Sequence, residues 1–278
     1  MKKHGIVAAI SAVLASPLTV PVAFGDVVVS GSMKTGVAYE ENKWAIVDNG
    51  SALAFEVDHN MGEDQTVFAL LEFNVDSAKG SILSGEDEGV TVVGLTGDWG
   101  LLSLGTQDST LNSVVGGFMD VGERYSGSAF LGQGSMMNSA FMAMQVGQIE
   151  VMGDLQMNSN GEDIDSATIG GLFEIGEVAI GVAYQNNDGS DDYSGVGAAI
   201  NLSGIDFAGG YNEMGSDNAW AINTSVAGLT VEYDQDGVGV DSVTATYALE
   251  LSEFAFVVAE WNGTGSENSG IVFLQMDF

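Results

Sequence analysis

Histidine and paired carboxylates are the side chains that could perform chemistry in this chain, and both are poorly placed for it. The sequence has no cysteine and two histidines, His4 and His59. A hydrolytic site needs a nucleophile or a water molecule activated by histidine or by paired carboxylates. The acidic runs Asp191-Asp192 and Glu86-Asp87-Glu88 lie in polar segments typical of solvated loops. We therefore predict no catalytic site, with an enzyme inside a membrane barrel as the competing class.

Calcium binding is a second alternative, suggested by two acidic segments. These are Asn186 to Asp192, and Asp234-Gln235-Asp236-Gly237 through Asp241. Both lack the regular oxygen-ligand spacing and the terminal bidentate Glu of an EF-hand loop. The pattern predicts no dedicated metal site and no cofactor, and leaves open weak cation bridging between loops or a calcium-binding surface protein.

The charge of the chain excludes several partners. There are 39 acidic residues against 6 basic ones, a formal net charge of −33. Nucleic acid is a poor partner, because phosphate binding requires clustered Lys and Arg. Such acidity is typical of hydration in a salty, halophilic or marine environment. Charged residues make up only 16% of the chain, below the roughly 25% usual for soluble domains, which fits a protein with much of its surface in lipid.

The N-terminus predicts export. Lys2 and Lys3 precede an apolar run from Ile6 to Val20, which Ala23-Phe24-Gly25 follows as a small-x-small cleavage site. The apolar run is too short to span a bilayer as a helix. We expect residues 1–25 to be a signal peptide and residues 26–278 to be one mature domain.

Alternation of apolar and polar residues dominates the mature chain. In Leu229 to Asp234, for example, Leu229, Val231 and Tyr233 alternate with polar residues, as in a sheet with one apolar and one polar face. Sixteen such strands are expected: Val27–Tyr39, Ser51–His59, Gln65–Asp76, Val90–Gly97, Gly100–Gln107, Met136–Val146, Ile149–Asn158, Ile164–Glu174, Gly176–Gln185, Tyr193–Leu202, Ile205–Asn212, Asn218–Val226, Leu229–Gln235, Asp241–Glu250, Glu253–Asn262 and Ser269–Phe278.

The connections between these strands alternate in length, which favours a membrane barrel over a soluble sandwich. Tight turns such as Gly147-Gln148 and Ala227-Gly228 alternate with longer polar segments such as Glu213 to Asp217 and Gly263 to Asn268. Short periplasmic turns and longer outer loops are typical of transmembrane β-barrels. The sequence thus predicts an all-β, sixteen-stranded antiparallel barrel with an aqueous lumen. On the polar face of its strands, carboxylates are expected to line the pore: Glu72, Glu150, Asp154, Glu232 and Asp234.

Three segments carry a resemblance to a known family. Val93 to Ser109 resembles a V-G-L-x-G-x-F-G-x-L-x-L-G-R-Q-x-S hairpin, Ser51 to Glu72 resembles the hairpin before it, and Val29 to Val37 resembles the opening strand. The family is that of the general diffusion porins of Gram-negative bacteria, which are trimeric sixteen-stranded barrels. The resemblance is specific over about the first 110 residues and at the C-terminal Phe278.

The resemblance implies a constriction made by a loop. In that family the loop after this hairpin, the third outer loop, folds into the barrel, and Asp108 to Ser135 matches it by position. Its charged residues are Asp108, Asp120, Glu123 and Arg124. Packing of the loop on the wall, with its charges merely solvated, is the alternative.

The wall opposite this loop is short of basic residues. Thr106 and Ser32 stand where the family often has arginine, which leaves Lys34 as the expected wall cation. The field across the pore should therefore be weak or one-sided. Phe278, with Met276 and Leu274 on the same parity, resembles the terminal signal read by the barrel assembly machinery.

The resulting hypothesis is an outer-membrane channel. We expect a homotrimeric, cation-selective pore for ions and small hydrophilic solutes, embedded in outer-membrane lipids. A substrate-specific outer-membrane channel is the alternative.

Overall fold

Strands make up most of the chain in the computed structural model. It describes residues 27–278 except 63, 83–88, 121, 126–128, 159–162 and 266. The expected signal peptide and the acidic run Glu86-Asp87-Glu88 lie outside the described residues. No helix among the described residues is long and apolar enough to cross a membrane.

The strands follow one another along the whole described chain, interrupted by one short helical segment. They are β1 (Val27–Glu40), β2 (Lys43–Asp48), β3 (Ser51–Gly62), β4 (Gln65–Asp76), β5 (Ser81–Ile82), β6 (Thr91–Gly97), β7 (Gly100–Asp108), β8 (Ser135–Val146), β9 (Ile149–Met157), β10 (Ile164–Ile175), β11 (Val178–Asn187), β12 (Tyr193–Leu202), β13 (Ile205–Met214), β14 (Asp217–Val226), β15 (Leu229–Gln235), β16 (Asp241–Ser252), β17 (Ala255–Thr264) and β18 (Glu267–Asp277). Between β7 and β8 lie the helix α2 (Thr110–Val114) and the 3-10 turn η1 (Gly116–Phe118).

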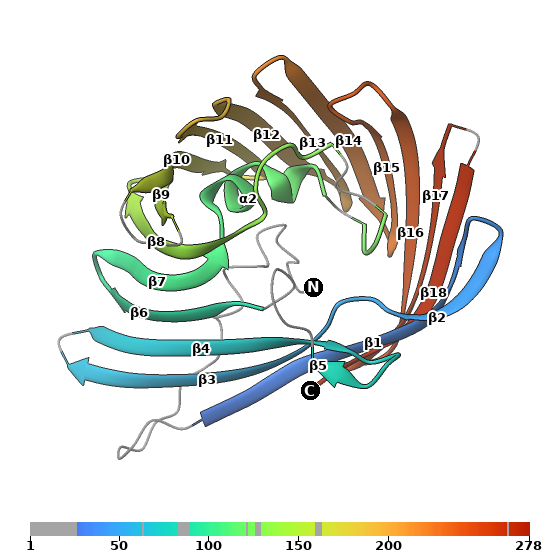
Figure 1. The fold of residues 1–278 in the computed structure, drawn as a ribbon, viewed down its shortest axis with the longest axis horizontal. Helices are drawn as coiled ribbons and strands as arrows, with labels where there is room; N and C mark the ends of the chain where they lie inside the picture. The colour runs from blue at the N-terminus through green and yellow to red at the C-terminus, as the bar shows by residue number, and fades with distance from the viewer. Residues whose placement is uncertain are drawn as a thin grey trace.

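The sheet closes into a barrel because β1 pairs antiparallel with β18 on one side and with β2 and β3 on the other (Figure 1). β2 and β3 are two halves of one barrel strand, interrupted at Asn49 and Gly50, and the two-residue β5 is a side pairing of β4. The 18 strand segments therefore form the predicted barrel of sixteen strands. Closure leaves no unpaired edge, which the hydrocarbon layer would not tolerate.

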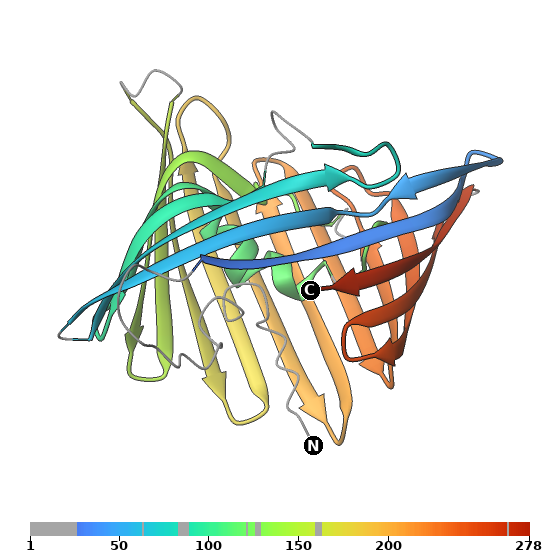
Figure 2. The same ribbon diagram turned by 90° about the horizontal axis from the view of Figure 1, so that it is seen from below.

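The strand faces alternate as the sequence predicts. On β11 the side chains of Ile180, Val182 and Tyr184 are exposed on the outside, while Ala183 and Gln185, which alternate with them, are buried on the inside. In Figure 2 the strands β10 to β16 run between two rims, with tight turns along the lower one. Glycine in the left-handed region, such as Gly147 (φ +67°) and Gly228 (φ +84°), makes these turns possible.

Two outer connections are shorter than expected. Glu213 to Asp217 was predicted as a loop, but β13 continues to Met214 and β14 begins at Asp217. Likewise β17 and β18 extend into the predicted loop Gly263 to Asn268. The strands β2 and β1 also pair through Lys43–Asp48, a segment between the first two predicted strands. These polar segments keep strand geometry because their ladder hydrogen bonds do not require an apolar face.

Candidate functional site

The long segment between β7 and β8, which we call the pore loop (residues 109–134), returns to its starting point. The side-chain oxygen of Ser109 accepts a hydrogen bond from the Asn112 N–H at 3.0 Å and so caps α2. The Ser109 N–H donates to the Gly134 carbonyl, also at 3.0 Å. The base of the loop is therefore closed, and its bounds agree with the predicted segment Asp108 to Ser135.

The pore loop lies inside the barrel and packs its apolar side chains on the wall. Figure 1 shows α2 against the inner side of the β10–β12 wall. The apolar residues of this contact are all buried: Leu111, Val114, Val115, Phe118 and Met119. A Cβ on Gly181 would lie 1.9 Å from the Val114 carbonyl oxygen, and one on Gly197 would lie 2.3 Å from the Phe118 ring. Glycine on the inner face therefore provides the space in which the loop docks.

Polar side chains of the wall hold the backbone of the pore loop. Asp154 on β9 accepts from the Thr110 N–H at 2.6 Å. Asn212 on β13 donates to the Ala129 carbonyl at 2.7 Å and accepts from the Leu131 N–H at 2.9 Å. Asn223 on β14 donates to the Phe118 carbonyl at 2.9 Å.

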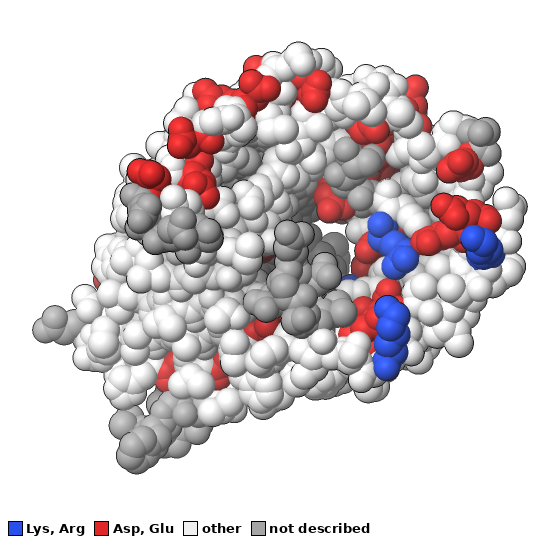
Figure 3. Space-filling view, in the orientation of Figure 1, with Lys and Arg blue, Asp and Glu red and all other residues white. Residues whose placement is uncertain are grey.

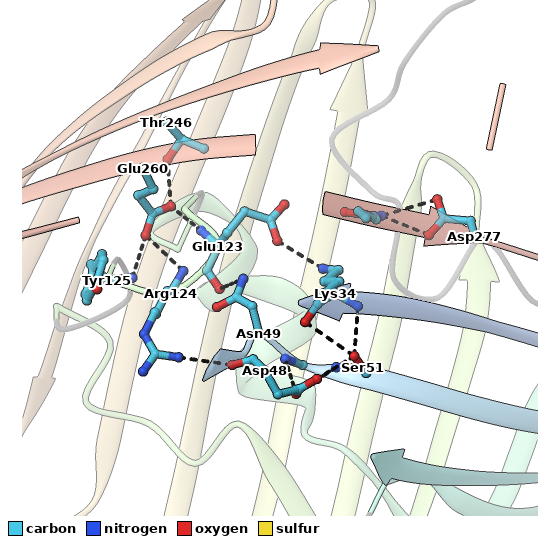
Figure 4. Close-up of polar contacts among 12 residues, drawn as sticks. Lys34, Asp48, Asn49, Ser51, Glu123, Arg124, Tyr125, Thr246, Glu260 and Asp277 are labelled. Atoms are coloured by element: carbon cyan, nitrogen blue, oxygen red, sulfur yellow. Dashed lines mark hydrogen bonds and ion pairs between the residues drawn. The ribbon is translucent and has the colours of Figure 1, made fainter. Parts of the chain in front are cut away.

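Glu260 on β17 anchors the far end of the loop (Figure 4). Its carboxylate accepts hydrogen bonds from three consecutive backbone N–H groups, those of Glu123 (2.6 Å), Arg124 (2.9 Å) and Tyr125 (2.7 Å). Thr246 on β16 donates to the same carboxylate at 2.7 Å. Hydrogen bonds to a charged group each contribute about 1.5 to 3 kcal/mol, so this contact fixes residues 123–125 on the wall at β17.

Two ion pairs join this end of the loop to the opening strand. The Lys34 Nζ lies 3.0 Å from Glu123 Oε2, and the Arg124 Nε lies 3.0 Å from Glu40 Oε1. The Tyr125 hydroxyl donates to the same Glu40 oxygen at 2.8 Å. Burial, followed by this hydrogen bond, raises the pKa of Tyr125 to about 12. The structure thus brings together Lys34, Glu123 and Arg124, three of the predicted constriction residues.

The other predicted constriction residues lie elsewhere. Asp120 is exposed on the pore loop, and Asp108 is at the end of β7, with Glu72 of β4 close enough for the two carboxylates to repel each other. Glu72 alternates with the exposed, outward-facing Leu71, which places Glu72 on the lumen side. Carboxylates therefore occur on the β4 and β7 wall as well as on the loop.

Three of the expected pore-lining carboxylates are covered. Asp154, Glu232 and Asp234 lie on the inner wall, as strand parity predicts, but only 3%, 1% and 0% of their surfaces are exposed. We expected them to line open water, and the structure places them in the buried wall instead. Glu72 and Glu150 keep partial exposure. The pore loop thus packs on the wall, as the alternative predicted. The far end of the loop also forms charged contacts.

The distribution of basic residues is uneven. In the sequence, no Lys, Arg or His follows Arg124. Figure 3 shows Lys and Arg at one side of the barrel mouth, next to acidic side chains, while Asp and Glu extend around the rim. The wall from β8 to β18 therefore carries negative side-chain charge only.

Sequence reasoning did not single out Glu260, Glu40 or Tyr125. Glu260 stands on the polar parity of its strand, between Ala259 and Trp261, and that parity was the available signal. Its partners are backbone N–H groups, which no sequence pattern marks.

Comparisons with known proteins agree with a closed sixteen-stranded barrel that has an inward-folded loop. A family model described as Gram-negative porin matches residues 6–270. The chain belongs to the Gram-negative porin family. No curated protein sequence matches this porin significantly.

Solved structures of outer-membrane proteins share the fold at low sequence identity. OmpF of Salmonella typhi, in complex with daunomycin, is 12% identical, with a TM-score of 0.75 over 91% of this chain and 98% of that one. The anion-selective porin from Comamonas acidovorans is 14% identical, with a TM-score of 0.70 over 91% and 100%. In-vitro folded OmpT of Vibrio cholerae, in its trimer form, is 12% identical, with a TM-score of 0.70 over 92% and 100%. Family and fold together are those of an outer-membrane diffusion channel.

Proposed function

We propose that this porin is a cation-selective, water-filled channel for ions and small hydrophilic solutes. The observation that carries the proposal is the pairing of basic residues at the pore loop. Lys34 and Arg124 are each bound to a glutamate, and the Glu260 carboxylate lies in the same network. The contact therefore has more carboxylates than basic groups, and an ion passing it meets net negative charge.

The wall adds to this potential. Glu72 and Asp108 lie on strands without a basic residue, and like charges in a narrow low-dielectric opening raise the local concentration of counter-ions. The effect falls with salt, because the Debye length shrinks from about 10 Å at 0.1 M to about 3 Å at 1 M. Selectivity should be clear in dilute salt and modest in brine.

The reversal potential of the purified porin in a planar bilayer under a KCl gradient tests this proposal. A potential of the sign set by K⁺ permeation, decreasing as both salt concentrations rise, supports it. A reversal potential at zero, or one set by Cl⁻ as in an anion-selective porin, contradicts it.

We also propose that the porin assembles as a homotrimer. The trimer form of the Vibrio cholerae OmpT structure supports this. Mass determination in detergent distinguishes a trimer from a monomer. N-terminal sequencing of the exported protein tests the cleaved leader, for which the proposed first residue is Asp26.

Recognition of the C-terminal strand by the assembly machinery is a further part of the proposal. Phe278, Met276 and Leu274 are exposed on one face of the last strand. The backbone of Phe278 pairs with Gly31 of β1 through hydrogen bonds of 3.0 and 3.1 Å. Deleting Phe278 should lower the amount of heat-modifiable barrel in the outer membrane, and unchanged assembly would contradict this role.

A further inference from the structure

A row of buried polar side chains crosses the wall behind α2. In the strand register, Asp154 of β9 lies opposite Thr168 of β10, Thr168 opposite Gln185 of β11, and Gln185 opposite Tyr193 of β12. Their exposed fractions are 3%, 7%, 4% and 1%. The outward neighbours Leu155, Ile169 and Tyr184 are exposed. The row therefore lies on the inner face of the barrel wall.

The first residue of α2 covers this row. Thr110 is fully buried, and its N–H donates to Asp154 Oδ2 at 2.6 Å. A Cβ on Gly170 would lie 2.8 Å from the Thr110 methyl carbon. Gly170 is on the same face of β10 as Thr168, two residues away. The Thr110 side chain thus lies between Asp154 and the β10 wall.

Five polar atoms of this group have no hydrogen-bond partner among the described residues. They are Asp154 Oδ1, Thr110 Oγ1, Thr168 Oγ1, Gln185 Nε2 and the Tyr193 hydroxyl. Leaving a buried donor or acceptor unpaired costs about 1 to 3 kcal/mol. The Tyr193 hydroxyl lies apart from the others, against Gly195. The other four atoms belong to Asp154 and to side chains beside it, and they indicate that a polar occupant binds there.

The charge of the row decides the class of this occupant. An ionised carboxylate in a buried site must be paired, and the chain has no basic residue after Arg124. Lys34 and Arg124 are already bound to Glu123 and Glu40. One carboxylate surrounded by hydroxyl oxygens matches a hard cation with a single positive charge, since oxygen ligands suit such ions. A divalent ion would leave an unmatched positive charge in a buried site.

We propose that this row is a resident site for a monovalent cation of the sodium type. Asp154 Oδ1, Thr110 Oγ1 and Thr168 Oγ1 are its protein ligands. A water molecule on the ion accepts a hydrogen bond from Gln185 Nε2, which as a donor cannot bind the ion. The ion neutralises Asp154 and joins α2 to β9 and β10, away from the open lumen and apart from conduction.

Anomalous scattering from thallium(I) tests this site directly. Crystals of the full porin, with sodium replaced by thallium(I) acetate, should show an anomalous peak beside Asp154. The peak should disappear in Asp154→Asn and in Thr168→Val, which nearly conserve side-chain size. It should persist in Asp234→Asn, a matched control that changes another buried wall carboxylate. Density without an anomalous signal in the wild type would identify water only and overturn the proposal, as would a peak that survives both variants.

A solution measurement gives an independent readout. The unfolding temperature of the wild-type barrel should be higher in NaCl than in N-methylglucamine chloride of equal ionic strength. Thr168→Val should lose this difference, whereas Asp234→Asn should keep it. Equal unfolding temperatures of the wild type in the two salts would contradict a resident ion.

Discussion

Lys34 on the opening strand and Glu123 on the pore loop form an ion pair with a distance of 3.0 Å between nitrogen and oxygen. These residues are separated by 89 positions in the sequence. The pair compensates the positive charge of Lys34 with the carboxylate of Glu123.

Lys34→Gln should make the channel more cation-selective. The substitution removes the positive charge and leaves the Glu123 carboxylate uncompensated. We expect the K⁺/Cl⁻ permeability ratio to rise about two-fold at 0.1 M KCl and by less at 1 M, where the Debye length is about 3 Å. Lys79→Gln is the control, because Lys79 pairs with Asp76 in a turn outside the loop contact. A ratio that changes equally in both variants would contradict the prediction.

Glu260→Gln should loosen the pore loop. A neutral amide loses the charge that holds three backbone N–H groups, and its own NH₂ cannot accept from them. We expect a loss of about 2 kcal/mol in loop anchoring, visible as larger open-channel current noise in single-channel recordings. Glu267→Gln, on the exposed rim at the start of β18, should leave the noise unchanged.

Gly181→Ala should displace the loop from the wall. The added Cβ would lie 1.9 Å from the Val114 carbonyl oxygen, so α2 has to move. Overpacking of this kind costs about 1 to 3 kcal/mol, and the unfolding temperature should fall. Gly171→Ala is the matched control, because its Cβ meets nothing closer than 3.7 Å. Equal unfolding temperatures for the two variants would rule out the tight docking.

Tyr125 should ionise late in alkaline titration. Its pKa is raised from 10.0 to about 12, first by burial and then by the Glu40 hydrogen bond. Because the folded-state pKa is raised, the stabilisation is fully present below about pH 10 and is lost as the pH rises through about 12. In an ultraviolet titration of the phenolates, the wild type should show a transition near pH 12 that Tyr125→Phe lacks. If the transition that Tyr125→Phe lacks lies near pH 10 instead, the Tyr125 hydroxyl is solvated.

The barrel itself could be predicted from the sequence, because alternation marks each strand and its loss marks the pore loop. The segment Lys43–Asp48 could not, since charged residues at both ends resemble a loop and only pairing with β1 makes it a strand. Strand parity placed Glu232 and Asp234 on the inner wall, but parity does not tell whether another segment covers that wall. Glu260 was missed because its partners are backbone N–H groups as far as 137 residues earlier.

The confinement of basic residues to the first part of the chain also has a consequence for proteolysis. After residue 26, a protease that cuts after Lys or Arg can act at Lys34, Lys43, Lys79 and Arg124, and nowhere beyond. Residues 125–278 would leave trypsin as one peptide, which contains every strand from β8 to β18. Enzymes of this specificity can cut the pore loop at Arg124 but cannot sever those strands from one another.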